Sequence, residues 1–394
     1  MREGRKRTRK TTAAAGLVLG LLLPAASGQR NPDLLRYKVE NDRTRTVKVK
    51  ILEYGYLQLK YQKDNRDPKE LPIDRVLTVR LGGFPTAYKQ GLAAEAQART
   101  GEGNLLKTLE KAADSFALAA NEEKLRQPLR ADALYRSAIC TLKLALAESS
   151  YIDKGAERFR EFLTSFPKHH EALQAILHLG KLLRLKGASD EAITELKKID
   201  QKVLDENIPT IWEVRSKLEQ VKAHFRAGRI QEARTTVANA NTLLAEISGR
   251  PEEVKSLQSQ SDLLKGRCDI VAKAYDTAVN YFEGIISQAG TDLTRKVVGL
   301  LGQGEAYYNK GKEQGDLGAL RKAQLAFARA SVLNPNLKEF GAKAAFFTGE
   351  VLTALAAKGE GAAYAQQAKD YYREVIRYYP LSDWSAGARK RLTE

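Results

Sequence analysis

One recurring spacing constrains this chain more than any other feature: a small residue, a large apolar residue four positions on, and another apolar residue three positions after that. On a helix these three positions share a face, and the small residue lets a second helix approach closely. The recurrence predicts about seven helical hairpins that pack side by side. The motif occurs at Ala112, Phe116, Ala119; Ala192, Leu196, Ile199; Ala233, Val237, Ala240; Ala278, Phe282, Ile285; Ala323, Phe327, Ala330; Ala368, Tyr372, Val375; and, in a weaker copy, Gly155, Phe159, Phe162.

The clearest hairpin is "GKLLRLKGASDEAITELKKI". Gly180 stands at a close-packing position of a first helix, Gly187 at a turn, and Ala192 at the crossing point of a second helix. These spacings resemble the tetratricopeptide repeat (TPR) consensus. The segments "FLTSFPKHHEALQAILHLG" and "VIRYYPLSDWSAGARKRL" are similar to exported bacterial TPR proteins, including Tol-Pal and outer-membrane-assembly-associated ones and planctomycete envelope proteins.

The resemblance implies a mainly α fold. It implies a TPR-like α-solenoid over residues 86–394 that ends in a C-terminal capping helix. The chain departs from the family in its period, because Ala233, Ala278, Ala323 and Ala368 are 45 residues apart where the usual repeat has about 34. We expect the extra residues to lengthen helices, with some of them in the loop "KEQGDLGALRK".

The periodicity before the helices is two. Apolar residues alternate with polar ones over 47–51, 57–61 and 77–81, which predicts half-buried strands. Fewer than 60 residues bury only a small core. Residues 29–85 are therefore predicted to form a small, basic, three-or-more-stranded β module that leans on the helices.

The first 28 residues have the composition of a signal peptide. "MREGRKRTRK" holds six basic residues and one Glu, and the apolar run 13–26 is 14 residues long, shorter than the roughly 20 that span a bilayer. The alternative is a buried helix, which fits a terminal position and a basic leader poorly. We expect export to the periplasm or cell envelope, without a transmembrane segment in the mature chain.

Basic residues are concentrated in the predicted β module. Residues 29–90 hold 14 basic and 8 acidic side chains. Lys48, Lys50, Lys60 and Arg80 fall on one strand face, which suits docking on an anionic envelope polymer, lipid headgroups or an acidic protein. The alternative is that these side chains only solvate the sheet and protect its edges. A nucleic-acid partner is not expected.

Family positions that line the concave face of TPR arrays select a tentative partner-binding surface. Its first members are basic and would suit protein segments with acidic residues or a terminal carboxylate. The alternative is a solvated helical face. The resemblance selects Gln174, His178, Lys181, Arg184, Lys222, Arg226, Arg267, Glu305, Tyr308, Asn309 and Glu350.

No catalytic, metal-binding or cofactor-binding constellation stands out. None of the four His residues has a metal-binding spacing with a helical Glu, and His169 and His170 are expected to be structural. Cys140 and Cys268 are expected to be small buried helix residues. The sequence therefore favours a non-enzymatic protein–protein interaction scaffold of the envelope. The alternative is polymer or membrane-surface binding by the β module, with the repeats as spacer.

Overall fold

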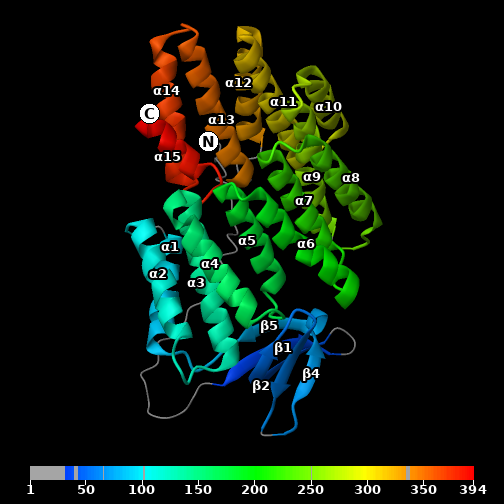
Figure 1. Cartoon of the computed structure of the whole chain (residues 1–394), viewed down its shortest axis with the longest axis vertical. Coiled ribbons are helices and arrows are strands. Elements are labelled where there is room, and N and C mark those ends of the chain that lie inside the picture. Colours follow the sequence, from blue (N-terminus) through cyan, green and yellow to red (C-terminus); the bar gives the residue numbers. More distant parts are fainter. Residues whose placement is uncertain (1–31, 40–42, 65, 101–102, 250, 334–337) are drawn as a thin grey trace, which may run out of the picture. The chain divides into compact units, whose positions relative to one another are not determined.

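The computed structural model of the chain describes residues 32–39, 43–64, 66–100, 103–249, 251–333 and 338–394. The predicted signal peptide, residues 1–28, lies outside these ranges. Residues 32–394 form one compact unit that is mainly helical, with a small antiparallel sheet at its N-terminal end (Figure 1). Within the described ranges, no helix combines the length and the apolar composition needed to cross a bilayer.

The sheet has five strands in the order β4-β3-β2-β1-β5. Its strands are β1 Asp33–Lys38, β2 Thr44–Tyr54, β3 Gln58–Gln62, β4 Lys69–Pro72 and β5 Val76–Arg80. The three predicted strands fall in β2, β3 and β5. The alternation did not reveal β1, in which two leucines are adjacent, or β4, which is short, charged and ends in proline.

The sheet buries a small core of its own. Leu35, Ile51 and Leu59 are at most 1% exposed, and they pack with residues from β4 and β5. Leu77 was expected to face this core but is 39% exposed. The register of β1 with β5 shifts between Arg36 and Tyr37, leaving Leu77 as an extra residue in β5. Such a bulge turns a side chain away from the alternation of its strand.

Fifteen helices follow in the described part of the chain. They are α1 Thr86–Thr100, α2 Leu105–Ala120, α3 Gln127–Ala147, α4 Ile152–Ser165, α5 Ala172–Lys186, α6 Ser189–Glu206, α7 Ile211–Arg226, α8 Ile230–Glu246, α9 Pro251–Val271, α10 Tyr275–Gln288, α11 Leu293–Gln314, α12 Leu317–Leu333, α13 Lys338–Ala357, α14 Ala362–Tyr378 and α15 Ser385–Thr393. The predicted lengthening is visible in α11, which has 22 residues against 15 in α5.

The seven sequence motifs lie on the seven even-numbered helices α2 to α14, and their large residues are at most 3% exposed. Five of the seven large residues pack onto a glycine of a neighbouring odd-numbered helix. A Cβ at Gly180 would lie 2.7 Å from Leu196, and one at Gly302 would lie 2.1–2.4 Å from three ring atoms of Phe282. We call this close packing of a large side chain on a helix glycine the glycine interlock. It also joins Gly91 to Phe116, Gly266 to Phe282, Gly304 to Phe327, and Gly349 to Tyr372.

Helix contacts follow the chain order. Each helix packs against the next, and the odd-numbered helices from α3 to α13 also contact the next odd-numbered helix. The predicted turn at Gly187 is confirmed, because this residue ends α5 with φ of 94°, a conformation that favours glycine. The architecture resembles that of helical-repeat proteins and is compatible with an α-solenoid.

One buried ion pair ties the sheet to the helices. Asp33 of β1 is 1% exposed, and its two oxygens accept hydrogen bonds from the Arg126 guanidinium at 2.7 and 2.8 Å. Asp33 also accepts from the backbone N–H groups of Ile51 and Gly82. Arg126 directly precedes α3, so one carboxylate holds three segments of the sheet at the start of a helix.

A second tie joins β2 to the loop before α5. His170 stacks on Tyr54 with ring centroids 3.6 Å apart, and the His170 backbone N–H donates to the Tyr54 carbonyl oxygen at 2.9 Å. Burial lowers the pKa of His169 to about 2 and that of His170 to about 4. Both rings are thus packed as neutral groups at neutral pH, in line with the structural role predicted for them.

The glycine interlock predicts a position-specific cost for one added methyl group. Gly302→Ala should lower the free energy of unfolding by about 1–3 kcal/mol, because the fully buried Phe282 ring has to move. Gly284→Ala in α10 is the matched control, since its Cβ would meet nothing within 4 Å; it should be neutral or stabilise by up to about 1 kcal/mol. Urea unfolding of both variants measures the difference, and equal effects would contradict the interlock.

The buried histidines predict acid sensitivity. Their pKa values are lower in the folded chain than the ordinary value of about 6.5, so the unfolded chain binds more protons. Stability is therefore complete above about pH 6.5 and declines as the pH falls toward about 4. In urea titrations, a His169→Asn, His170→Asn variant should lose less stability than the parent between about pH 6.5 and 5. An unchanged decline would assign the acid sensitivity to other groups.

Candidate partner-binding surface

The eleven residues selected by the TPR resemblance all lie on odd-numbered helices, α5, α7, α9, α11 and α13. Because these helices contact one another in succession, the residues belong to one layer of the fold. Most of them are engaged within the protein, in three groups of charged or polar side chains.

The basic members of the surface carry their own counterions. Lys181 of α5 pairs with Asp383 at 2.6 Å, and Lys222 of α7 pairs with Glu219 at 2.6 Å. Arg184 lies between the two carboxylates, 3.9 Å from Asp383 and 4.0 Å from Glu219. Asp383 comes from the loop before α15, so the far end of the chain supplies one of the two acids.

The pKa values of the two acids show how strongly the cations act on them. Burial favours the neutral form of Asp383 and Glu219, but the positive charges around them outweigh this effect and lower both pKa values. At neutral pH three cations therefore face two carboxylates. Arg226, by contrast, is exposed and makes no ion pair with a described residue.

A second group crosses three helices. Glu305 of α11 is 3% exposed and pairs with Arg267 of α9 at 3.1 Å and Lys343 of α13 at 2.8 Å. Burial opposes ionisation of Glu305, yet the two cations hold its pKa below its usual range. The acid bridges its neighbours, and Asn309 donates to the Glu305 carbonyl oxygen at 2.7 Å.

A third group is built around Glu350 of α13. Its carboxylate accepts hydrogen bonds from Tyr308 at 3.1 Å, from Tyr372 at 2.8 Å, and from Arg391 at 2.7 and 2.9 Å. Burial by itself would raise the pKa of Glu350. Arg391 and the two hydroxyls lower this pKa by a larger amount, so the net shift is downward. Arg391 therefore anchors the terminal helix α15 on α13.

Gln174 and His178 form the remaining pair of α5. Their Nε2 atoms are 3.1 Å apart, and the His178 ring packs against Phe159 with centroids separated by 5.6 Å. Burial lowers the pKa of His178 to about 4. This ring is therefore neutral at neutral pH and adds no charge to the basic group.

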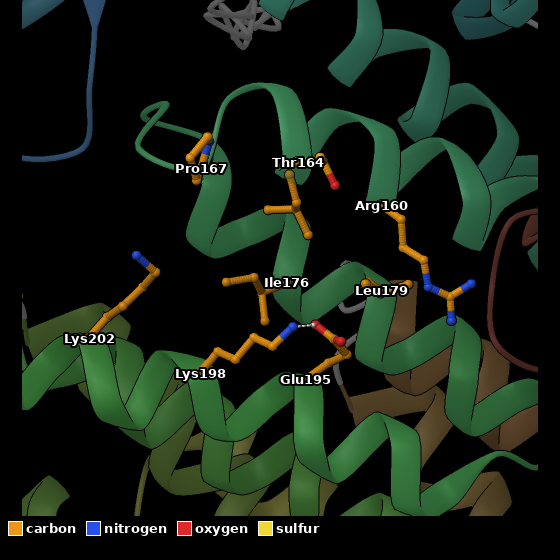
Figure 2. A pocket seen from close by; sticks show the side chains of 9 residues that line it. Arg160, Thr164, Pro167, Ile176, Leu179, Glu195, Lys198 and Lys202 are labelled. Atoms are coloured by element: carbon orange, nitrogen blue, oxygen red, sulfur yellow. Dashed lines mark hydrogen bonds and ion pairs between the residues drawn. The ribbon is translucent and has the colours of Figure 1, made fainter.

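A hollow with a volume of ≈ 400 Å³ lies elsewhere, between α4, α5 and α6. Figure 2 shows its lining: side chains of α6 project toward it from one side and those of α4 from the other, with Ile176 of α5 between them. The lining is apolar at Leu163, Pro167, Ile176 and Leu179, and polar at Arg160, Thr164, Glu195, Lys198 and Lys202.

The cations at the rim of the hollow are each paired with a carboxylate. Lys198 pairs with Glu195 at 2.7 Å, and Lys202 pairs with Glu206 at 3.0 Å. Arg160 pairs with Glu191, and both side chains are nearly half exposed. An exposed pair such as Arg160–Glu191 contributes about 0–1 kcal/mol, so an incoming group can replace it at little cost.

Sequence reasoning missed the hollow. Family positions pointed to the first helix of each hairpin, whereas the walls here are formed by two second helices, α4 and α6. A signal was present in "EFLTSFP", where half-buried Leu163 follows the buried Phe162 on another face of α4 and Pro167 stands in the turn after the helix. Periodicity alone does not tell such a half-buried Leu from a core residue.

Cys140 in α3 and Cys268 in α9 are free and buried, as expected, and burial raises the pKa of both thiols to about 11. Neither thiol is therefore activated at neutral pH. In the described part of the chain, no three His, Cys, Asp or Glu side chains come together in a way that could hold a metal ion.

The Glu350 group predicts a specific effect of losing one cation. Arg391→Ala should cost about 2 kcal/mol at pH 7, because it leaves a buried carboxylate without its counterion while the exposed part of Arg391 contributes little. Lys390→Ala, beside it and 78% exposed at the side chain, should cost almost nothing.

Acid unfolding of the same pair of variants provides a second measurement. A carboxyl whose pKa is lowered by folding stabilises the protein above its unfolded pKa, and this stabilisation is lost as the pH falls. Without Arg391, the pKa of Glu350 rises and part of this stabilisation disappears. Urea unfolding at pH 7 and at lower pH should show a flatter acid limb for Arg391→Ala than for Lys390→Ala; parallel limbs would argue against the pairing.

Comparison with known proteins gives no family assignment. No protein-family model matches the chain, and neither does any curated protein sequence.

Proposed function

We propose that this chain is a non-enzymatic interaction scaffold built on a TPR-like α-solenoid of about seven helical hairpins. Three observations support this proposal. The even-numbered helices carry one repeated motif, and the large residue of this motif packs onto a glycine of the preceding helix in five of them. Odd-numbered helices also contact one another in succession. Export to the periplasm or cell envelope, inferred from residues 1–28, is part of the same proposal.

The hollow between α4, α5 and α6 is the observation that carries a binding role. Apolar side chains line it and cations stand on its rim, so it suits a protein segment that inserts an apolar side chain and carries acidic residues beside it. The cations of both surfaces are paired with carboxylates, but Lys181, Arg184 and Lys222 on the odd-numbered helices are only 17–27% exposed at the side chain. Arg160 and Lys198 on the rim are 46% and 55% exposed, so they are more accessible to an acidic segment. Recognition at exposed Arg226 stays a prediction.

Site-specific photo-crosslinking tests the binding role of the hollow. A photoreactive amino acid replaces Thr164, an exposed residue of the hollow, or Thr235, an exposed residue of α8, as the matched control. Full chain carrying each probe is irradiated in an envelope extract of the source cells. A discrete protein adduct at Thr164 and none at Thr235 would support the proposal, whereas the same adducts at both positions, or none, would contradict it.

Charge reversal on the rim predicts a loss of that adduct. Arg160→Glu with Lys198→Glu should lower the yield at Thr164 by about tenfold, since two favourable charges become repulsive toward an acidic segment. Both side chains are exposed, so the unfolding midpoint should change little. An undiminished yield would remove the charged rim from recognition.

A further inference from the structure

The face of the sheet opposite its core carries four exposed cations, Arg36, Lys48, Lys50 and Arg80. Each lies next to a residue that packs in or against the sheet core, and the alternation of strands turns it to the other side. We call these four residues the basic sheet face. It does not depend on the hollow or on the solenoid.

The strand register fixes how these cations are arranged. Lys48 and Arg80 both lie opposite Leu34, one on either side of β1. Arg36 is two residues along β1 and so is a diagonal neighbour of both, at about 7–8 Å between positions. Lys50 follows Lys48 on β2 at about 7 Å. The cations thus form a zigzag across three adjacent strands.

Edge protection does not explain this arrangement. The edges of the sheet are β4 and β5, whereas Arg36, Lys48 and Lys50 lie on the inner strands β1 and β2. Charges protect a sheet against pairing only where its edge is open. Of the predicted basic residues, Lys60 is different, because it lies 3.9 Å from Glu70 on β4.

The four cations are also unused by the fold. None of them makes an ion pair or a side-chain hydrogen bond with another described residue. Like charges at these separations repel one another. The repulsion is relieved when a partner brings negative charge to the face.

The surroundings of Arg36 indicate which anion fits. Across the strands, Arg36 lies between Thr46 on β2 and Thr78 on β5, both exposed. A guanidinium fork flanked by two hydroxyls matches the several acceptor oxygens of a phosphate group better than a single carboxylate.

We propose that the basic sheet face binds a linear phosphate-bearing polymer that runs along the zigzag and contacts several of the four cations at once. A polymer fits better than a membrane surface, because the positions between the cations hold Thr46, Thr78 and half-buried Leu34. Leu77, beside Thr78, is the only large apolar side chain of β1, β2 and β5 that is exposed, at 39%. Membrane-surface segments typically add exposed aromatic or long apolar anchors to their basic residues.

Binding of inorganic polyphosphate to the full chain tests this proposal. Titration calorimetry compares a long polyphosphate with inorganic phosphate, which reaches one cation only. We expect the long chain to bind at least about a hundredfold more tightly, since each added charge contact raises affinity. Its affinity should fall steeply as salt is raised. Equal binding of both probes would overturn the proposal.

Matched variants separate the basic sheet face from net charge. Lys48→Glu with Lys50→Glu should weaken polyphosphate binding by about tenfold or more. Lys107→Glu with Lys111→Glu on α2, both exposed, changes the net charge equally and should weaken it by less than about twofold. Equal losses in the two pairs would show nonspecific attraction and overturn the proposal. If the first pair does not fold, Lys48→Gln with Lys50→Gln replaces it.

Two further arms test the chemistry. Arg36→Lys keeps the charge but removes the fork, and should weaken polyphosphate binding by about threefold. Vesicles of phosphatidylglycerol in phosphatidylcholine present phosphate on a plane. Tighter binding to these vesicles than to polyphosphate, lost in the Lys48→Glu, Lys50→Glu variant, would overturn the polymer in favour of a membrane surface.

Discussion

The helical part of this structure depends on close contact between a bulky side chain and the bare backbone of a neighbouring helix. Phe282 fits between two such places, Gly266 on α9 and Gly302 on α11. One ring thus sets the approach of α10 to both of its neighbours. Repeated along the chain, this contact sets the spacing between helices. That spacing brings the charged side chains of the odd-numbered helices close enough to form ion pairs.

Ionic bridges on the odd-numbered helices add directional links to this packing. Glu305 joins α9, α11 and α13, and Glu350 joins α11, α13 and α15. Burial of such carboxylates is costly, and well-placed cations offset the cost rather than adding a large surplus. Their main contribution is therefore to specify which helices pair with one another.

The helices and their crossing points could be predicted because they depend on neighbours in sequence. The spacing of Ala323, Phe327 and Ala330 places all three on one helical face whatever lies around them. The partners of Arg391 and Asp383 could not be predicted, since each lies in a helix far away along the chain. The exposure of Leu77 could not be predicted for a related reason, because the bulge that turns this side chain outward depends on how β5 pairs with β1.

The contact of Asp383 with Lys181 joins residues about 200 positions apart, and α15 also touches α3. Repeat proteins whose units touch only adjacent units can fold and unfold piece by piece. Here the middle of the chain gains its final contacts only after the last helix has been synthesised. Folding should therefore be complete only when the last helix is in place, and small deletions at the C-terminus should loosen helices near residue 181.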